Sequence, residues 1–200
     1  MEAWPFEQVL AARHGQTEWN LDGRLQGHLD SPLTGLGVAQ GRAAAAVLAA
    51  QDVDSVFSSP LGRAFKSATL CAARLGLPVT IVEALAEVHH GEMAGMTATE
   101  IDEVFPGALA CRAAGKYEWR FPGGESYADA DVRASGALRY VADSGARRPL
   151  IVSHEMIGRM LLRNLLDADP VTALDWSHPH DVIYQVDIRA RARREIRLRS

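Results

Sequence analysis

The sequence predicts an α/β fold, a three-layer sandwich in which helices cover both faces of a mainly parallel β-sheet. Short apolar runs of strand length alternate along the chain with longer helix-forming segments, which is typical of such sheets. Three of the short runs stop at residues suited to hold a phosphate group: Arg13-His14, Ser58-Ser59 and His154. Because ligands bind at the carboxyl ends of the strands in open α/β sheets, we expect these residues to meet at one edge.

The composition is that of a soluble globular protein. The 200 residues fit one domain, residues 1–200, with 48% hydrophobic and 23% charged side chains. A net charge of −4 argues against nucleic acid as a partner, although a local Arg and His cluster can still attract an anion. No apolar stretch approaches the ~20 residues that span a bilayer, and the first residues do not resemble a secretory signal. Cys71 and Cys111 are expected to be reduced thiols in a cytoplasmic protein without membrane contacts.

The first quarter of the chain divides into a strand, a loop, a helix and a second strand. The first strand is expected over residues 8–12, and a loop rich in Gly, Asp and Pro follows over residues 23–37. Thr34 is the predicted N-cap of an Ala-rich helix that runs to Ala50. The second strand is expected over residues 54–58.

The next helix is predicted to begin with Ser59 as its N-cap and Pro60 at its first position. Arg63 then lies in or just past the first turn, where unpaired backbone N–H groups and the helix dipole already favour an anion. Gly76 should end this helix, and the β-branched residues 79–82 form a third strand.

The second half continues the alternation. Residues 97–100 form a capping box before a short helix, and Ser126 is the expected N-cap of a helix that reaches about Asp143. A fourth strand over residues 150–153 ends at His154 and leads into another helix. The tail, residues 182–200, alternates apolar and polar residues and is expected to form one or two edge strands protected by charge.

The charged residues at the strand ends meet the requirements of phosphoryl transfer, which depends on positioning and on stabilising negative charge at the phosphoryl oxygens. Arg13 and Arg63 would hold those oxygens, with His154 and the Asn20 amide as further donors. Gly15 would let the backbone turn close to the ligand. No metal or other cofactor is expected, because the arginines supply the positive charge.

The reaction also needs a nucleophile and a proton donor. His14 would attack phosphorus and form a phosphohistidine, because imidazole is the side chain best suited to this near neutral pH. A carboxylic acid must protonate the departing oxygen and later deprotonate the attacking water. Glu87 is the candidate, with Glu83 and Glu92 as nearby alternatives.

Several sequence blocks follow one another in a distinctive order. They are Arg13-His14-Gly15 with Thr17, Trp19 and Asn20; Gly23-Arg24-Leu25-Gln26-Gly27; Pro32-Leu33-Thr34; Ser58-Ser59-Pro60-Leu61 with Arg63; Leu85-x-Glu87; Pro122-Gly123-Gly124-Glu125-Ser126; and Val152-Ser153-His154. Across residues 9–187 this series resembles the histidine phosphatase superfamily, which includes the cofactor-dependent phosphoglycerate mutases.

The resemblance implies a phosphoglycerate-mutase-like fold and a metal-independent hydrolase of small phosphate esters. It implies the following site: His14 as nucleophile, Glu87 as proton donor, Arg13, Arg63 and His154 around the phosphate, and Asn20 and Gln26 as substrate contacts. Arg24, in the same loop as Gln26, and Gly15 are further expected substrate contacts. Arg24 and Gln26 could instead simply tie their loop down. Glu155 departs from the pattern, because the family often has Gly after the second histidine. We expect its side chain to point away from the phosphate and its backbone N–H to remain available to substrate.

Two other functions remain open at this stage. A phosphoglycerate mutase would use the same phosphohistidine, but true mutases typically carry a long insertion, whereas only residues 96–121 separate Gly95 from Pro122 here. A non-catalytic phosphate-binding module would be expected to have lost His14, Arg63 or Glu87. A metal site at His178 and His180 is disfavoured, because a proline separates them and no cysteine is near. The natural ester and the oligomeric state stay open, with a homodimer as one alternative.

Overall fold

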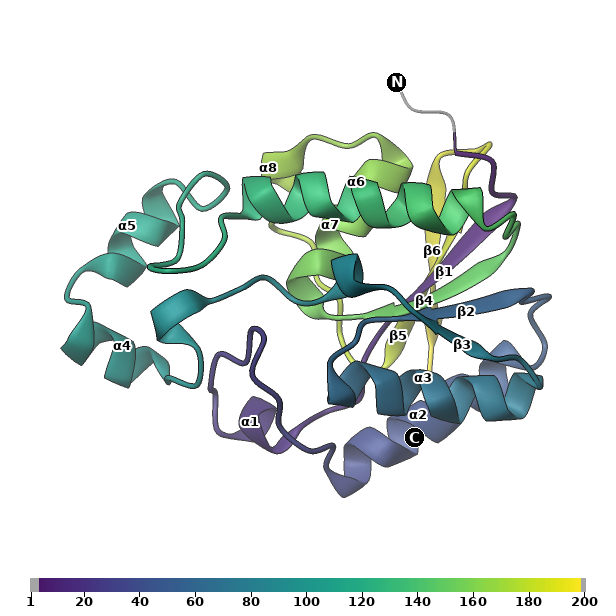
Figure 1. The fold of residues 1–200 in the computed structure, drawn as a ribbon, viewed down its shortest axis with the longest axis horizontal. Helices are drawn as coiled ribbons and strands as arrows, with labels where there is room; N and C mark the ends of the chain where they lie inside the picture. Colours follow the sequence, from purple (N-terminus) through teal and green to yellow (C-terminus); the bar gives the residue numbers. More distant parts are fainter. Residues whose placement is uncertain (1–3, 199–200) are drawn as a thin grey trace.

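The computed structural model describes residues 4–198, which form a six-stranded sheet in the order β3-β2-β4-β1-β5-β6 (Figure 1). The strands are β1 (Gln8–Arg13), β2 (Ser55–Ser58), β3 (Val79–Ile81), β4 (Pro149–Ser153), β5 (Val182–Asp187) and β6 (Ala192–Arg197). The first four pair in parallel, while β5 runs antiparallel to both β1 and β6. The α/β prediction with a mainly parallel sheet is therefore confirmed.

Helices cover both faces of this sheet. They are α1 (Glu18–Leu21), α2 (Gly35–Leu48), α3 (Gly62–Leu75), α4 (Ala98–Val104), α5 (Ala108–Ala114), α6 (Tyr127–Asp143), α7 (Glu155–Leu166) and α8 (Pro170–Ala173), with the 3₁₀ turns η1 (Glu83–Leu85) and η2 (Gly91–Met93). Figure 1 shows α2 and α3 below the sheet and α6, α7 and α8 above it. The short helices α4 and α5 project to the left of the sandwich.

Alternating side chains of the central strands supply the two halves of the core. Val9 and Ala11 of β1 belong to the apolar cluster that includes α6 and α7. Leu10 and Ala12 belong to the cluster that includes α2 and α3. Since successive strand residues point to opposite faces, a strand buried on both sides is apolar at nearly every position. All five residues of β4 are buried, and only Ser153 at its end is polar.

The caps predicted for three helices are confirmed. Thr34 accepts a hydrogen bond from the N–H of Gly37 at the start of α2. Thr97 and Ser126 each form a capping box at the starts of α4 and α6. These local bonds explain why the sequence placed the starts of those helices correctly.

The start predicted for α3 is wrong. The helix begins at Gly62 with Leu61 as its N-cap residue, and not at Ser59 and Pro60. The Ser59 hydroxyl accepts a hydrogen bond from the N–H of Leu61 and pairs with His154, so this serine turns the chain before the helix instead of capping it. Arg63 still lies in the first turn.

The C-terminal segment confirms the expected strands and adds one difference. Of the two C-terminal strands, only β6 lies at an edge of the sheet, because β5 lies between β1 and β6. The last two residues of the predicted tail, 199 and 200, lie outside the described residues, as do residues 1–3 at the start. Cys71 and Cys111 are both free thiols, as expected. Within residues 4–198, none of the helices combines the length and apolar character that crossing a bilayer requires.

Candidate active site

His14 follows β1 directly, and only 2% of its surface is exposed. Its Nδ1 lies 2.7 Å from the carbonyl oxygen of Gly15, so Nδ1 carries the proton in this contact. Burial lowers the pKa of His14 well below its usual value, and the charges of Arg13 and Arg63 lower it further. A neutral ring protonated on Nδ1 has its lone pair on Nε2, which is the form required of a nucleophile.

Arg63 lines the same cavity as His14 and is held there by residues 27–30 of the loop between α1 and α2. Its Nη1 donates to the Asp30 carboxylate at 2.9 Å and to the Leu29 carbonyl at 2.7 Å. Its Nη2 donates to the Gly27 carbonyl at 2.8 Å. Because three acceptors fix the guanidinium, its position toward a ligand is set in advance.

Arg13 is the last residue of β1, and its guanidinium is engaged by acceptors from the other end of the chain. Its Nη1 lies 2.8 Å from Glu155 Oε2 and 3.3 Å from the carbonyl oxygen of His178. Glu155 also pairs with Arg159 through its other oxygen, at 2.5 Å. The expectation that the Glu155 side chain points away was therefore wrong, because two arginines draw its carboxylate to the site.

His154 lies at the N-cap of α7 and is fully buried. Its ring centroid is 5.1 Å from that of His14, and its Nε2 lies 2.7 Å from the Ser59 hydroxyl. Burial lowers its pKa well below the usual value, and Arg63 adds to this effect. The structure thus places His154 beside the His14 ring, although it does not line the cavity described below.

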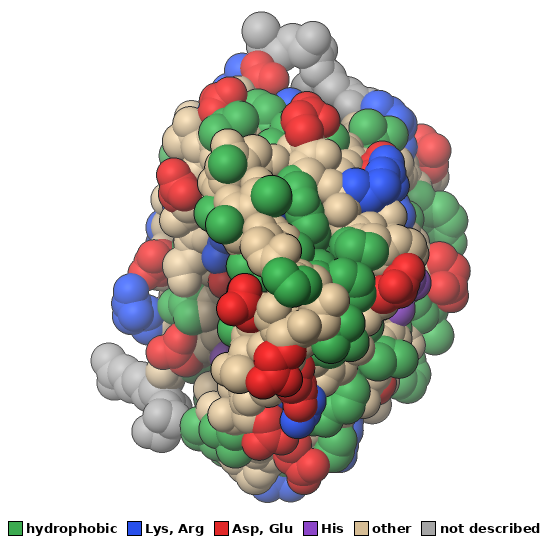
Figure 2. Space-filling view, turned by 90° about the vertical axis from the view of Figure 1, so that its left-hand side faces the viewer, with side chains coloured by type: hydrophobic (Ala, Val, Ile, Leu, Met, Phe, Trp, Pro, Cys, Tyr) green, Lys and Arg blue, Asp and Glu red, His purple; other side chains and the backbone are tan. Residues whose placement is uncertain are grey.

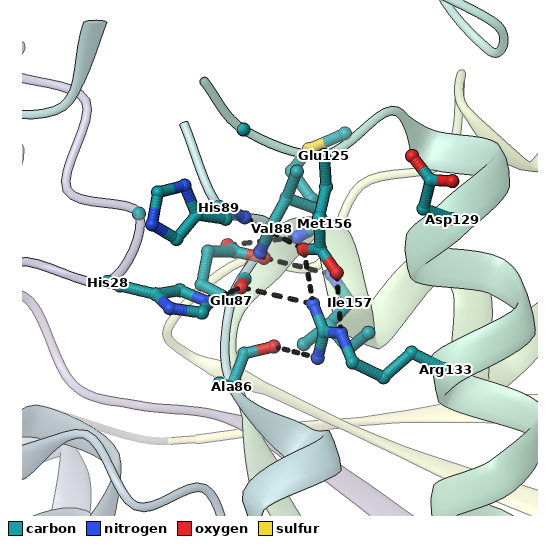
Figure 3. Close-up of polar contacts among 12 residues, drawn as sticks. His28, Ala86, Glu87, Val88, His89, Glu125, Asp129, Arg133, Met156 and Ile157 are labelled. Carbon is teal, nitrogen blue, oxygen red and sulfur yellow. Dashed lines mark hydrogen bonds and ion pairs between the residues drawn. The ribbon is translucent and has the colours of Figure 1, made fainter. Parts of the chain in front are cut away.

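Glu87 reaches the site from the segment after η1, and 7% of its surface is exposed. Its carboxylate accepts backbone N–H groups of Val88 and Ile157 at 3.0 Å each and of Met156 at 3.2 Å. Met156 and Ile157 belong to the first turn of α7, so the unpaired backbone N–H groups at the start of that helix hold the Glu87 side chain (Figure 3). These donors fix the carboxylate in the site.

The two alternative carboxylates are not part of this arrangement. Glu83 in η1 and Glu92 in η2 are both exposed. Neither lines the cavity that contains Glu87. The geometry therefore favours Glu87 among the three.

Arg133 of α6 supports the backbone that carries Glu87, and no pattern in the sequence around it indicated this role. Its guanidinium donates to the carbonyls of Ala84, Ala86 and Glu87 and to both oxygens of Glu125. Figure 3 shows this guanidinium beside Ala86 and Glu87 and below the Glu125 carboxylate. A single side chain on a long helix thus sets the path of the segment that delivers the carboxylate.

Asn20 and Gln26 both line the cavity and are joined by Thr17. The Asn20 Oδ1 accepts from the backbone N–H of Thr17 at 3.0 Å and from its hydroxyl at 2.9 Å. Gln26 donates from Nε2 to the same hydroxyl at 2.8 Å. The buried Oε1 of Gln26 has no hydrogen-bond partner within residues 4–198.

Arg24 and Gly15 are positioned mainly by structural contacts. Arg24 lines the cavity, but its Nη1 lies 2.7 Å from both the Gly95 carbonyl and the Glu100 carboxylate, so it ties the loop to α4. Gly15 does not line the cavity. A Cβ at Gly15 would lie 2.2 Å from the carbonyl oxygen of Gly37, so glycine is required there by the neighbouring backbone.

A cavity of about 180 Å³ joins these groups at the carboxyl edge of the sheet. Its lining includes eight of the ten residues predicted from the sequence, all except Gly15 and His154, and adds Leu25, Gly27, His90, Arg112, Tyr127 and Met156. Arg112 escaped prediction because the sequence around it has no clear helical period. Tyr127 directly follows the Ser126 cap, which placed it at a helix start but gave no sign of the site.

His178 and His180 contact the site as structural partners. His180 Nδ1 donates to the carbonyl oxygen of His14 at 2.6 Å. His178 is buried against Gly158 of α7, and a Cβ at that glycine would lie 2.2 Å from the His178 Nδ1. The part of the chain that the structure describes has no group of three or more His, Cys, Asp or Glu side chains placed to hold a metal ion.

Known proteins share both the sequence and the architecture. Glucosyl-3-phosphoglycerate phosphatase of Mycolicibacterium vanbaalenii is 43% identical over 128 residues, which cover 64% of this chain and 56% of the relative. Phosphoserine phosphatase 1 of Hydrogenobacter thermophilus is 31% identical over 163 residues, covering 81% of this chain and 77% of the relative. The native structure of a mycobacterial glucosyl-3-phosphoglycerate phosphatase matches with a TM-score of 0.81 at 28% identity, covering 96% of this chain and 98% of that one.

The match to the mycobacterial sequence thus spans little more than half of that relative's length. The family model for the histidine phosphatase superfamily, branch 1, matches residues 9–199 and so includes every block from Arg13 to His154. The chain therefore belongs to branch 1 of the histidine phosphatase superfamily.

Proposed function

We propose that this protein is a phosphomonoesterase that hydrolyses small phosphate esters through a phosphohistidine on His14. The observation that carries the proposal is the neutral His14 ring, whose Nδ1 proton is committed to the Gly15 carbonyl while two arginines lie at the same cavity. Family membership and the phosphatase names of the relatives support hydrolysis.

In the first step His14 Nε2 attacks phosphorus, an N–P bond forms and the bond from phosphorus to the ester oxygen breaks. Glu87, in its protonated form, gives its proton to the departing oxygen. Arg13 and Arg63 stabilise the charge on the phosphoryl oxygens, with the His154 ring behind His14. In the second step Glu87 takes a proton from water, the hydroxide attacks phosphorus, and the N–P bond breaks to restore neutral His14.

The size of the cavity supports a small substrate. About 180 Å³ is below the ~300 Å³ at which sites for drug-sized ligands begin, so the cavity fits a compact metabolite. Asn20, Gln26 and the backbone N–H of Glu155 are the proposed further substrate contacts. The relatives act, by name, on glucosyl-3-phosphoglycerate and phosphoserine, which supports a small phosphorylated metabolite as the substrate.

The test is hydrolysis of p-nitrophenyl phosphate between pH 5 and 8, with and without EDTA, by the wild type and by His14→Ala. We expect turnover that survives EDTA and disappears in His14→Ala. Arg74→Gln, at an exposed position on α3, is the control and should leave turnover unchanged. Rapid quenching at alkaline pH should trap phosphate on His14, detected by mass spectrometry. Full activity in His14→Ala would refute the mechanism. Interconversion of 2- and 3-phosphoglycerate faster than phosphate release would identify a mutase instead.

A further inference from the structure

Arg112 of α5 lines the cavity without an acidic partner. Within residues 4–198 it forms no ion pair, and its buried Nε has no hydrogen-bond partner. Its Nη2 donates to the Tyr127 hydroxyl at 2.7 Å, and its guanidinium carbon lies 5.5 Å from the centre of the Phe121 ring. The aromatic rings hold the guanidinium in place but do not neutralise its charge.

A second cation approaches the same tyrosine. Lys116 Nζ lies 5.9 Å from the centre of the Tyr127 ring, and no ion pair of Lys116 is present in the described part of the chain. Burial lowers the pKa of Lys116, and the charges of Arg159 and Arg112 lower it further. Asp175 and Glu155 are the carboxylates near Lys116, but neither forms an ion pair with it in the described part of the chain, and the two oxygens of Glu155 are engaged by Arg13 and Arg159. The positive charge around Tyr127 is therefore only partly compensated.

This charge does not belong to a generally basic surface. Figure 2 shows the face of the molecule on the side of α4 and α5, where acidic and hydrophobic side chains predominate and basic ones are few. All three charged residues of α4 are acidic: Glu100, Asp102 and Glu103. The inward position of Arg112 thus contrasts with the acidic exterior of the same lobe.

We propose that Arg112 and the Tyr127 hydroxyl bind a carboxylate on the leaving group of the substrate. The phosphoryl group would occupy the end of the cavity at His14, and the carboxylate the end at Arg112. This assignment rests on the proposed function and names the class of ester: a phosphorylated small carboxylic acid.

The donors at Arg112 suit a carboxylate better than a second phosphate. Arg112 offers a planar fork that matches a carboxylate, and Tyr127, which accepts a hydrogen bond from Arg112, has its own O–H free to donate. Burial raises the pKa of Tyr127, which keeps this proton on the hydroxyl. The proposed phosphoryl site, by contrast, has two arginines, Arg13 and Arg63, for the greater charge of a phosphate.

The experiment compares two pairs of esters that differ mainly in a carboxylate. They are 3-phosphoglycerate against glycerol 3-phosphate, and O-phosphoserine against O-phosphoethanolamine. The wild type is expected to favour the carboxylate member of each pair, and Arg112→Gln should reduce kcat/KM for that member roughly 10- to 100-fold, mainly through KM. For the member without a carboxylate, kcat/KM should change less than about 3-fold in Arg112→Gln, because this ester lacks the group that the Arg112 charge would bind.

Tyr127→Phe should also reduce the preference for the carboxylate member of each pair, by a smaller factor than Arg112→Gln. Arg120 is an exposed arginine, and Arg120→Gln should leave this preference unchanged. Equal wild-type activity on both members of each pair, or an equal loss on both in Arg112→Gln, would overturn the carboxylate site. In either case p-nitrophenyl phosphate hydrolysis through His14 would still support the proposed function. Absence of that hydrolysis would refute the proposed function itself.

Discussion

Arg13 Nη1 lies 2.8 Å from Glu155 Oε2, so an arginine proposed to hold phosphate is already paired with a carboxylate of the same chain. The Arg13 side chain is 13% exposed and that of Glu155 is 30% exposed. A phosphate that approaches Arg13 must therefore compete with Glu155. The pair sets how strongly Arg13 attracts an anion.

Glu155→Gln should strengthen the binding of inorganic phosphate. The substitution removes a negative charge from the cavity wall while keeping the size of the side chain, and the gain should reach about 5-fold in Kd, as for a partly exposed ion pair. Isothermal titration calorimetry with phosphate would measure it, with Glu118→Gln at an exposed position as the control. Unchanged or weaker phosphate binding would show that Glu155 does not oppose the ligand.

Arg133→Lys should slow catalysis without weakening binding. Lysine keeps the charge but cannot donate at once to Glu125 and to the carbonyls around Glu87, so the carboxylate of Glu87 should lose its fixed position. We expect kcat to fall roughly 10- to 100-fold with KM little changed, because small misplacement of a reacting group is costly. Steady-state kinetics would test this against Arg139→Lys, on the exposed side of the same helix. A rise in KM alone would contradict a positioning role.

Gly158→Ala and Gly136→Ala should have opposite effects on stability. A Cβ at Gly158 would lie 2.2 Å from the buried His178 ring, so overpacking should cost about 1–3 kcal/mol. A Cβ at Gly136 in α6 would meet nothing within 4 Å, so alanine should stabilise the helix by about 0.5–1 kcal/mol. Urea unfolding of both variants would measure the two changes. A stable Gly158→Ala protein would mean that His178 can move aside.

The free energy of unfolding should fall as the pH decreases from about 6.5 toward 4. Burial lowers the pKa of His90 and of His180 to about 4 and that of His178 to about 3. Below pH 6.5 the unfolded chain therefore binds protons that the folded protein does not, and stability is fully present only above that pH. Each such histidine adds a slope of up to about 1.4 kcal/mol per pH unit.

Urea unfolding at pH 7, 6 and 5 would measure this slope before the carboxylates begin to titrate. His90→Gln, which removes one of the titrating groups, should make the slope shallower. A free energy of unfolding that is the same at pH 7 and pH 5 would contradict the prediction.

The sequence predicted most of the fold because the relevant signals are local. Apolar runs mark the buried strands, and the side chains of Thr34, Thr97 and Ser126 bond to backbone only three residues away. The start of α3 was missed because Ser59 uses its hydroxyl for a partner 95 residues distant, His154. Such a partner leaves no mark in the neighbouring sequence.

The same distinction applies to the candidate site. Arg13, His14 and Arg63 could be placed because each stands at or just past the end of a recognisable strand, and parallel strand ends meet at one edge. The orientation of Glu155 could not be predicted, since it depends on where two arginine side chains lie in three dimensions. Arg112 lies in a lobe outside the sheet, where no strand or cap fixes its direction in advance.

The order of strands has a consequence for how the protein is made. Both neighbours of β1 come from the last part of the chain, since β4 begins at Pro149 and β5 at Val182. During synthesis the first strand therefore leaves the ribosome long before either partner exists. His14 gains the hydrogen bond from His180 only after nearly the whole domain has emerged. A nascent chain thus carries the proposed nucleophile from the start, but can form this hydrogen bond only after residue 180 has been synthesised.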